Sequence, residues 1–261
     1  MNQTERRIYL VKELLKEQEN RNLSIPENEN EQKHLLRSLM NVRMPASIGQ
    51  KFLKIQDEYL QQAVTEKGIT DIRDLQPVCK DIYLWQGDIT TLRCDAIVNA
   101  ANSQMLGCFY PCHGCIDNAI HTYAGIQLRL ECAELMKQQG HNEEAGKAKI
   151  TSAYNLPCKY VLHTVGPVVL GNLTVSDEKM LASCYLSCLS LAEKKGLSSI
   201  AFCCISTGEF RFPREEAAHI ALAAVTDWMN ANPQYEIRVV FDVFTEQDND
   251  IYTQLLSGCS A

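Results

Sequence analysis

The chain has 261 residues, of which 46% are hydrophobic and 22% charged, so it can bury a sizeable core and is not a disordered chain. Twenty-five basic residues against 32 acidic ones give a formal net charge of −7. No run of basic residues occurs, which argues against duplex nucleic acid as a partner. The charged N-terminus lacks the apolar core of a signal peptide, and no stretch reaches the ~20 apolar residues of a membrane span. We therefore expect a cytoplasmic protein with no membrane contact. Its twelve cysteines are then expected to be buried thiols, metal ligands or reactive thiols rather than disulfides.

Residues 1–75 are predicted to form a helical extension. Apolar side chains recur at three- and four-residue spacings in 6–18, 31–43 and 50–68, which indicates three amphipathic helices. A polar segment marked by proline, 24–31, connects the first two. The extension carries no chemical motif. We expect it to cover one face of the sheet that follows, and recognition of a partner protein is the alternative.

Residues 76–261 are predicted to form one α/β domain. Short β-rich runs alternate with longer helical patterns, and this alternation implies crossover connections. The fold expected is a three-layer α/β/α domain with a mixed, mostly parallel sheet. The predicted strands begin near residue 81 and include 95–101, 159–165, 199–206 and 236–244, and the predicted helices are 116–139, 177–196 and 214–232. Ligands of such sheets bind beyond the carboxyl ends of the strands, here after 97–102 and 203–209.

Three short motifs at predicted strand ends have side chains suited to a nucleotide. Asp88 in "QGDIT" can accept hydrogen bonds from an exocyclic amine, or it can cap a turn or helix. "NAAN" supplies Asn99 and Asn102, whose amides can pair with ribose hydroxyls or bond their own loop. The small residues of "STGEF", 206–210, let backbone N–H groups converge on an anion before a helix begins, although an ordinary turn has the same composition.

The stretch "GCFYPCHGCIDNAIH", 107–121, is rich in metal ligands. Cys108, Cys112, His113 and Cys115 offer thiolate and imidazole groups within eight positions, a set that suits Zn²⁺. Three ligands would leave an open catalytic position, whereas four would close a structural site. Neighbouring ligands such as Cys112 and His113 are awkward around one ion, which favours leaving Cys112 out, although it could replace Cys108. Buried thiols without a metal are the alternative.

Four motifs in order, "QGDIT", "DAIVNAANSQML", "YVLHTVGP" and "ISTGEFRFPREEAAHIA", resemble those of a macrodomain, the α/β/α module that binds ADP-ribose. The resemblance is closest to the ADP-ribosyl hydrolase branch and, within it, to the sirtuin-linked zinc-containing macrodomains of bacteria. Those carry a helical N-terminal extension and a Cys/His insert, so the resemblance covers nearly the whole chain. "CIDNAIHTYAG" keeps the ending of the hydrolase pattern GGGGVDxAIH, with its glycines replaced. Many macrodomains also have glycine at the position of Arg211, so we expect a bulkier and more cationic pocket rim.

The resemblance implies a set of site residues. Asp117 falls on the catalytic aspartate, and Asn102 lies near the distal ribose. One Zn²⁺ per chain is expected on Cys108, His113 and Cys115. His121 is expected to pack or hydrogen-bond structurally rather than bind zinc, and His163 is expected to support the pocket without a catalytic role. The implied ADP-ribose contacts are Asp88, Ile89, Asn99, Ala101, Asn102, Ser206, Thr207, Gly208, Glu209 and Phe210, where Phe210 would lie over a ribose.

The function implied is that of a zinc-dependent protein-ADP-ribose hydrolase, which removes mono-ADP-ribose from acidic side chains by cleaving an ester. Zinc could act as a Lewis acid, activate a water or position the ribose. The implied partners are ADP-ribose and an ADP-ribosylated protein. In bacterial relatives that protein is a lipoylated carrier of the glycine-cleavage H type, modified by a macrodomain-linked sirtuin. The alternative function is a non-catalytic reader of ADP-ribose with a structural zinc.

Overall fold

The computed structural model describes residues 1–18 and 24–259. Among the described residues, no helix is both long and apolar enough to cross a membrane. The helices are α1 (Gln3–Glu17), α2 (Glu29–Val42), α3 (Gln50–Lys67), α4 (Ile116–Ala124), α5 (Ile126–Gln139), α6 (Val175–Lys194), α7 (Arg214–Ala231) and α8 (Glu246–Leu256). The strands are β1 (Thr70–Asp71), β2 (Ile82–Gln86), β3 (Leu92–Arg93), β4 (Ala96–Ala100), β5 (Ala148–Ser152), β6 (Tyr160–Thr164), β7 (Ser199–Phe202) and β8 (Arg238–Val243).

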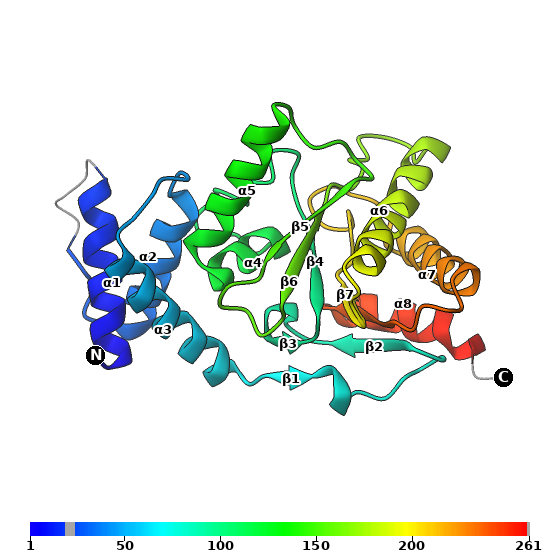
Figure 1. Ribbon diagram of the computed structural model, residues 1–261, viewed down its shortest axis with the longest axis horizontal. Helices are drawn as coiled ribbons and strands as arrows, with labels where there is room; N and C mark the ends of the chain where they lie inside the picture. Colours follow the sequence, from blue (N-terminus) through cyan, green and yellow to red (C-terminus); the bar gives the residue numbers. More distant parts are fainter. Residues whose placement is uncertain (19–23, 260–261) are drawn as a thin grey trace.

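Helices α1 to α3 form a bundle at the N-terminal end of the molecule (Figure 1). The apolar positions that predicted these helices bury into a core of their own, with Leu10, Leu36 and Phe52 at most 3% exposed. Ile126 of α5 belongs to the same core, so the bundle and the following domain share apolar surface. The division of the chain at residue 75 stays a prediction.

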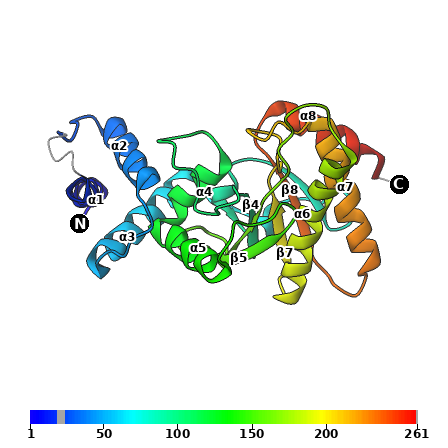
Figure 2. The same cartoon turned by 90° about the horizontal axis from the view of Figure 1, so that it is seen from above.

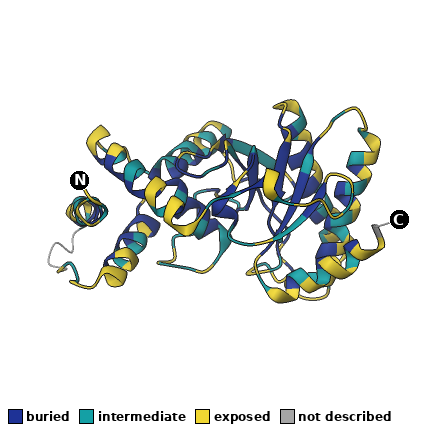
Figure 3. Ribbon diagram, turned by 90° about the horizontal axis from the view of Figure 1, so that it is seen from below, coloured by how far each residue is buried: buried dark blue, intermediate teal, exposed yellow. Residues whose placement is uncertain are grey.

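The central sheet has six strands in the order β2-β8-β7-β4-β6-β5. All neighbouring pairs are parallel except β5 with β6, and β1 and β3 form a separate parallel pair. The inner strands β4, β6, β7 and β8 are almost entirely buried (Figure 3). Helices α4 and α5 pack beside β4 and β5, α6 contacts β5 and β6, and α8 contacts β2 and β8. The predicted three-layer α/β/α fold with a mixed, mostly parallel sheet is confirmed.

Several elements differ from those predicted, among them the short strands β1 and β3. The helical pattern of 116–139 is broken at Gly125, whose φ of 97° is one that side-chain-bearing residues rarely adopt. A Cβ there would also lie 2.6 Å from Gln56 Nε2, so the break lets α3 approach closely. Strand β5 and helix α8 were not predicted because neither has a continuous apolar run: β5 is an edge strand with mostly half-buried residues, and α8 is mainly polar.

The helical extension rests on α4 and α5 rather than on the sheet, so the expectation that it covers one sheet face is wrong. Its main contacts with the domain join α2 and α3 to α4, and α3 to the 3₁₀ turn η2 (Ile89–Thr91). In Figure 2 the bundle lies beside α4 and α5 at one end of the molecule. Gln56 Oε1 of α3 accepts a bond from the Ile126 backbone N–H, which caps the start of α5 at 3.0 Å.

Candidate functional site

The predicted site residues follow β2, β4 and β7, which run parallel and end at the same edge of the sheet. Asp88 follows β2, the "NAAN" amides lie at the end of β4, and residues 206–210 follow β7. The cysteine-rich loop lies between β4 and α4, so its end carries α4 and Asp117 back to the same edge. This position beyond the carboxyl ends of parallel strands is the usual ligand site of such folds.

Asp117, in the first turn of α4, is 5% exposed and is held by the two asparagines of β4. Asn99 Nδ2 donates to Asp117 Oδ1 at 2.8 Å, and Asn102 Nδ2 donates to Oδ2 at 3.3 Å. Burial raises the pKa of this carboxyl to about 6, although both asparagine bonds oppose that shift. The structure thus brings the two predicted catalytic residues into direct contact.

Asn99 and Ala101 are both 0% exposed, so they are too deeply buried to contact a ligand directly. Asn99 supports Asp117 from behind, and Ala101 donates its backbone N–H to Thr164 O at 2.9 Å. Asn102 is half-buried, and its side chain also donates to Gly107 O at 3.1 Å and accepts from the Gln104 N–H. Of these three residues, Asn102 is placed to meet a ligand while bonding its own loop.

Two buried histidines lie behind Asp117. His163 Nδ1 is 3.1 Å from Asn99 Nδ2, and its Nε2 is 2.9 Å from Thr151 Oγ1. His121 has no hydrogen-bond partner for either ring nitrogen. One nitrogen of each ring and the Cys132 sulfur all lie within 4.8 Å of one another. Burial lowers the pKa of His163 to about 3 and that of His121 well below its ordinary value, so both rings are neutral supports.

The neutral state of His163 predicts acid sensitivity. Its folded pKa of about 3 lies below the ordinary value of about 6.5, so the stability it contributes is present above pH 6.5 and is lost as the pH falls toward 3. The free energy of unfolding should fall by about 1.4 kcal/mol per pH unit for this group between pH 6 and pH 4. In urea unfolding we expect the slope of His163→Gln to be smaller than that of the wild type by the share of this one group. Equal slopes in the two proteins would show that the His163 ring protonates alike in the folded and unfolded chain.

The metal loop, residues 107–115, brings three of its four candidate ligands together. The ligand atoms of Cys108, His113 and Cys115 all lie within 4.8 Å of one another. Cys112 is outside the group: its Sγ donates to His34 O of α2 at 3.4 Å. Its φ of 53° turns the chain at this point, which separates it from the neighbouring histidine.

These three side chains fit Zn²⁺. Tetrahedral zinc binds thiolate at about 2.3 Å and imidazole at about 2.0–2.1 Å, so a small closure of the three ligand atoms would complete a site with one open position. His113 Nδ1 is buried and has no hydrogen-bond partner, as an unliganded metal-binding nitrogen would be. Its Nε2 lies 3.5 Å from Glu209 Oε1. A carboxylate there can orient the ring, as carboxylates commonly do for metal-binding histidines.

Residues 206–210 form a loop suited to an anion. No acceptor is found, among the described residues, for the backbone N–H groups of Gly208, Glu209 and Phe210. Ser206 is 5% exposed, has a φ of 66°, and its hydroxyl packs so tightly on Gly166 that a Cβ at that glycine would lie 1.9 Å from it. These unpaired donors have the geometry of an oxyanion-binding concavity.

Thr207 contributes less to this loop, because its hydroxyl donates to Cys204 O at 3.0 Å and bonds the chain locally. Phe210 is half-buried at the rim. Arg211 beside it is exposed and has a φ of 59°, the conformation that glycine would otherwise favour. The rim is therefore bulky and cationic at this position, as the sequence indicated.

Asp88 takes the capping role considered for it. Its side chain caps η2 by accepting from the Thr90 N–H at 3.0 Å, and Lys67 Nζ of α3 donates to its Oδ2 at 2.7 Å. Burial raises the pKa of Asp88, but the bonds from Lys67 and Thr90 outweigh burial and lower it below the ordinary value. Ile89 is 1% exposed, so it can only form the floor of this end of the site.

Two residues near Asp88 were not predicted. Phe244 is 77% exposed and directly follows β8, whose register aligns Val243 with Gln86 of β2, two residues before Asp88. A large aromatic side chain left in water at a strand end suits stacking on a flat ring. The sequence could have indicated Phe244 as a site residue, because it directly follows an apolar predicted strand. Lys67 gave no such signal, because its contact joins positions 21 residues apart through tertiary packing.

The Macro domain family matches residues 98–221. A protein-ADP-ribose hydrolase of Treponema medium is 57% identical over 98% of this chain and 100% of that protein. This chain belongs to the macrodomain family. A protein-ADP-ribose hydrolase of Staphylococcus aureus is 48% identical over 94% of this chain and 93% of that protein. A Trypanosoma brucei macrodomain solved in complex with ADP-ribose has a TM-score of 0.66 and 33% identity, covering 82% of this chain and 93% of that one.

These relatives confirm the predicted macrodomain fold and the hydrolase class. The full-length matches to the two hydrolases span the helical extension and the metal loop of this macrodomain.

Proposed function

We propose that this macrodomain is a zinc-dependent protein-ADP-ribose hydrolase that removes mono-ADP-ribose from acidic side chains. One observation carries the proposal: Asp117, in the first turn of α4, contacts Asn102. The N-cap of the same helix, Cys115, belongs to the Cys/His group. A carboxylate, an amide and a candidate metal site thus meet at one sheet edge. A reader of ADP-ribose would need only the anion loop and the β2 end of that edge.

ADP-ribose would lie along the strand ends. Asp88 would face the adenine amine, with Phe244 beside it, and the free N–H groups of residues 208–210 would bind the diphosphate. The distal ribose would then reach Asn102 and Asp117. This order follows the spacing of the loops along the edge, from β2 through β7 to β4.

The reaction consumes water and yields ADP-ribose and the free carboxylic acid of the target protein. Asp117 would accept the proton of the attacking water, and Asn102 would orient the ribose hydroxyls. Asn99 holds the Asp117 carboxylate in place from the buried side. Zn²⁺ on Cys108, His113 and Cys115 would supply positive charge to polarise the reacting oxygen atoms or to orient the ribose.

The proposed substrate is an ADP-ribosylated protein with an ester-linked modification. We propose a lipoylated carrier protein, modified by a macrodomain-linked sirtuin, as the physiological partner, and the support for it is the resemblance to zinc-containing macrodomains of bacteria. Acidic-residue specificity fits a site that must bind and release a carboxylate beside a cation.

The linkage can be tested with three modified proteins that carry ADP-ribose on glutamate or aspartate, on arginine, or on serine. We expect release of free ADP-ribose from the first only. Release from arginine or serine at the same rate would contradict the acidic specificity. Binding of free ADP-ribose without release from any of the three would make the chain a reader.

A further inference from the structure

The helical extension reaches the metal loop through one side chain, Arg37 of α2. Its Nη2 donates to His113 O at 2.9 Å and to Asn118 Oδ1 at 2.8 Å, and its Nε donates to the same Oδ1 at 3.2 Å. These bonds join positions 76 and 81 residues apart in the chain. The guanidinium therefore fixes both the backbone at a candidate ligand and the amide of a neighbouring side chain.

Asn118, which is 0% exposed, connects Arg37 to the other two candidate ligands, Cys108 and Cys115. Its Nδ2 donates to Tyr110 O at 3.0 Å and to Cys108 O at 3.4 Å, and its backbone N–H donates to Cys115 Sγ at 3.4 Å. Together, Arg37 and Asn118 contact the backbone or the sulfur of every residue in the Cys108, His113 and Cys115 group.

The orientation of the Asn118 amide depends on Arg37. With its oxygen turned to the guanidinium, its NH₂ group points at the loop carbonyls. A neutral side chain at position 37 would leave a buried carbonyl oxygen without a donor, which costs about 1–3 kcal/mol in general and permits the amide to rotate away from the loop. The loop would then lose two of its backbone anchors.

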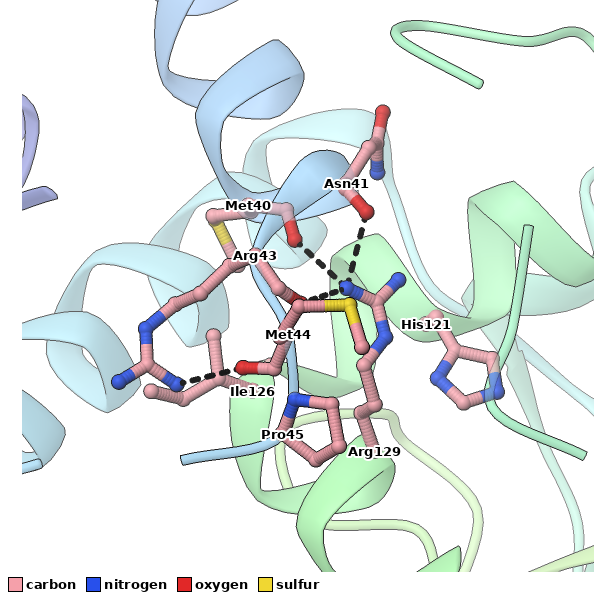
Figure 4. Close-up of a pocket in the computed structure, with 9 residues that line it drawn as sticks. Met40, Asn41, Arg43, Met44, Pro45, His121, Ile126 and Arg129 are labelled. Atoms are coloured by element: carbon pink, nitrogen blue, oxygen red, sulfur yellow. Dashed lines mark hydrogen bonds between the residues drawn. The ribbon is translucent and has the colours of Figure 1, made fainter. Parts of the chain in front are cut away.

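Two further contacts hold the loop against the same helix. Asn41 Oδ1 accepts from the Cys112 N–H at 2.9 Å, and its Nδ2 donates to Thr122 Oγ1 at 2.9 Å. Arg129 of α5 donates through Nε to Leu106 O at 2.7 Å and through Nη1 to the last carbonyls of α2 (Figure 4). Helix α2 thus bonds directly to Cys112 and His113 of the metal loop and, through Arg129, to Leu106 just before it.

We propose that Arg37, acting through Asn118, is a positioning residue that sets the metal affinity of the loop. The proposal rests on the proposed function in one respect, namely that the loop binds Zn²⁺. The proposal gives the helical extension a role at the site, since α2 would hold the zinc ligands of the metal loop in position before zinc binds. Outer contacts that orient metal ligands typically change affinity by about 10- to 100-fold when they are removed.

The test is the Zn²⁺ dissociation constant of the full chain, measured by competition with a chromophoric chelator. We expect Arg37→Met to weaken zinc binding by about 10- to 100-fold and Arg37→Lys, which keeps the charge but not the two-pronged contact, to weaken it less. Lys33→Met is the matched control, because Lys33 is on the same helix and pairs with Glu29, one turn away, instead of the loop. That variant should bind zinc as the wild type does.

Equal zinc affinity for Arg37→Met and the wild type would overturn the proposal, and so would a wild type that binds no zinc. The thermal unfolding midpoint of each metal-free variant shows whether the change acts on the fold as a whole. If Arg37→Met does not fold, the comparison of Arg37→Lys with Lys33→Met decides. Arg37-dependent zinc binding in a protein that releases no ADP-ribose would support the positioning role while refuting the hydrolase.

Discussion

Asp117→Asn is expected to lower the rate of ADP-ribose release by about 10²- to 10⁴-fold, the range for loss of a general base. Asparagine has nearly the same shape, and its oxygen can still accept from Asn102. Its NH₂ group can donate to Asn99 once the Asn99 amide turns to present its unpaired Oδ1. It cannot, however, accept a proton from water. The carboxylate is 5% exposed and already bound by both amides, so little rearrangement should follow. Single-turnover release from a glutamate-modified protein, with zinc content matched, measures this effect.

The matched control for Asp117→Asn is Asp227→Asn, the same chemical change on the exposed face of α7. It should release ADP-ribose at the wild-type rate. Binding of free ADP-ribose should remain within about threefold in both variants, because the adenine and diphosphate contacts lie elsewhere. Wild-type turnover by Asp117→Asn would remove the carboxylate from the mechanism.

Cys115→Ser is expected to abolish stoichiometric zinc binding and to lower ADP-ribose release by on the order of 100-fold or more, since metal charge contributes several kcal/mol to such reactions. Serine is the suitable substitution because Cys115 Sγ caps α4 by accepting from the Asn118 N–H, and a hydroxyl oxygen keeps that cap. Metal analysis and release are measured on the same preparation.

Cys112→Ser tests whether Cys112, like Cys115, is needed for zinc binding. Its sulfur faces α2 and lies outside the ligand group, so the variant should keep about one zinc per chain and its activity. If Cys112→Ser lost zinc and Cys115→Ser kept it, the ligand set proposed for the loop would be wrong. Loss of folding by Cys115→Ser would show instead that the metal serves mainly as a structural clip.

The sequence predicted the fold well where local patterns repeat. Alternating β-rich runs and helical periods were enough for the mostly parallel sheet, whereas the antiparallel strand β5 and helix α8 have too few apolar residues to produce a pattern. The break between α4 and α5 depends on the approach of Gln56 to Gly125, which is a tertiary contact. Such contacts leave no periodic trace in the sequence.

The candidate site was predicted in part. Motif order placed Asn102, Asp117 and the Cys/His loop together, and the structure brings them to one sheet edge. Sequence could not show that Asn99 lies behind Asp117 or that Cys112 turns away toward α2. It also gave no reason to connect the helical extension with the site, because the bonds of Arg37 span more than 70 residues.

The central claim is that hydrolysis depends on zinc in this loop. The most direct test is to strip the wild-type protein of metal, add Zn²⁺ in steps and measure the rate of ADP-ribose release from a glutamate-modified protein at each occupancy. The rate should rise in proportion to bound zinc and level off at about one zinc per chain. A metal-free protein that releases ADP-ribose as fast as the zinc-loaded one would contradict the account.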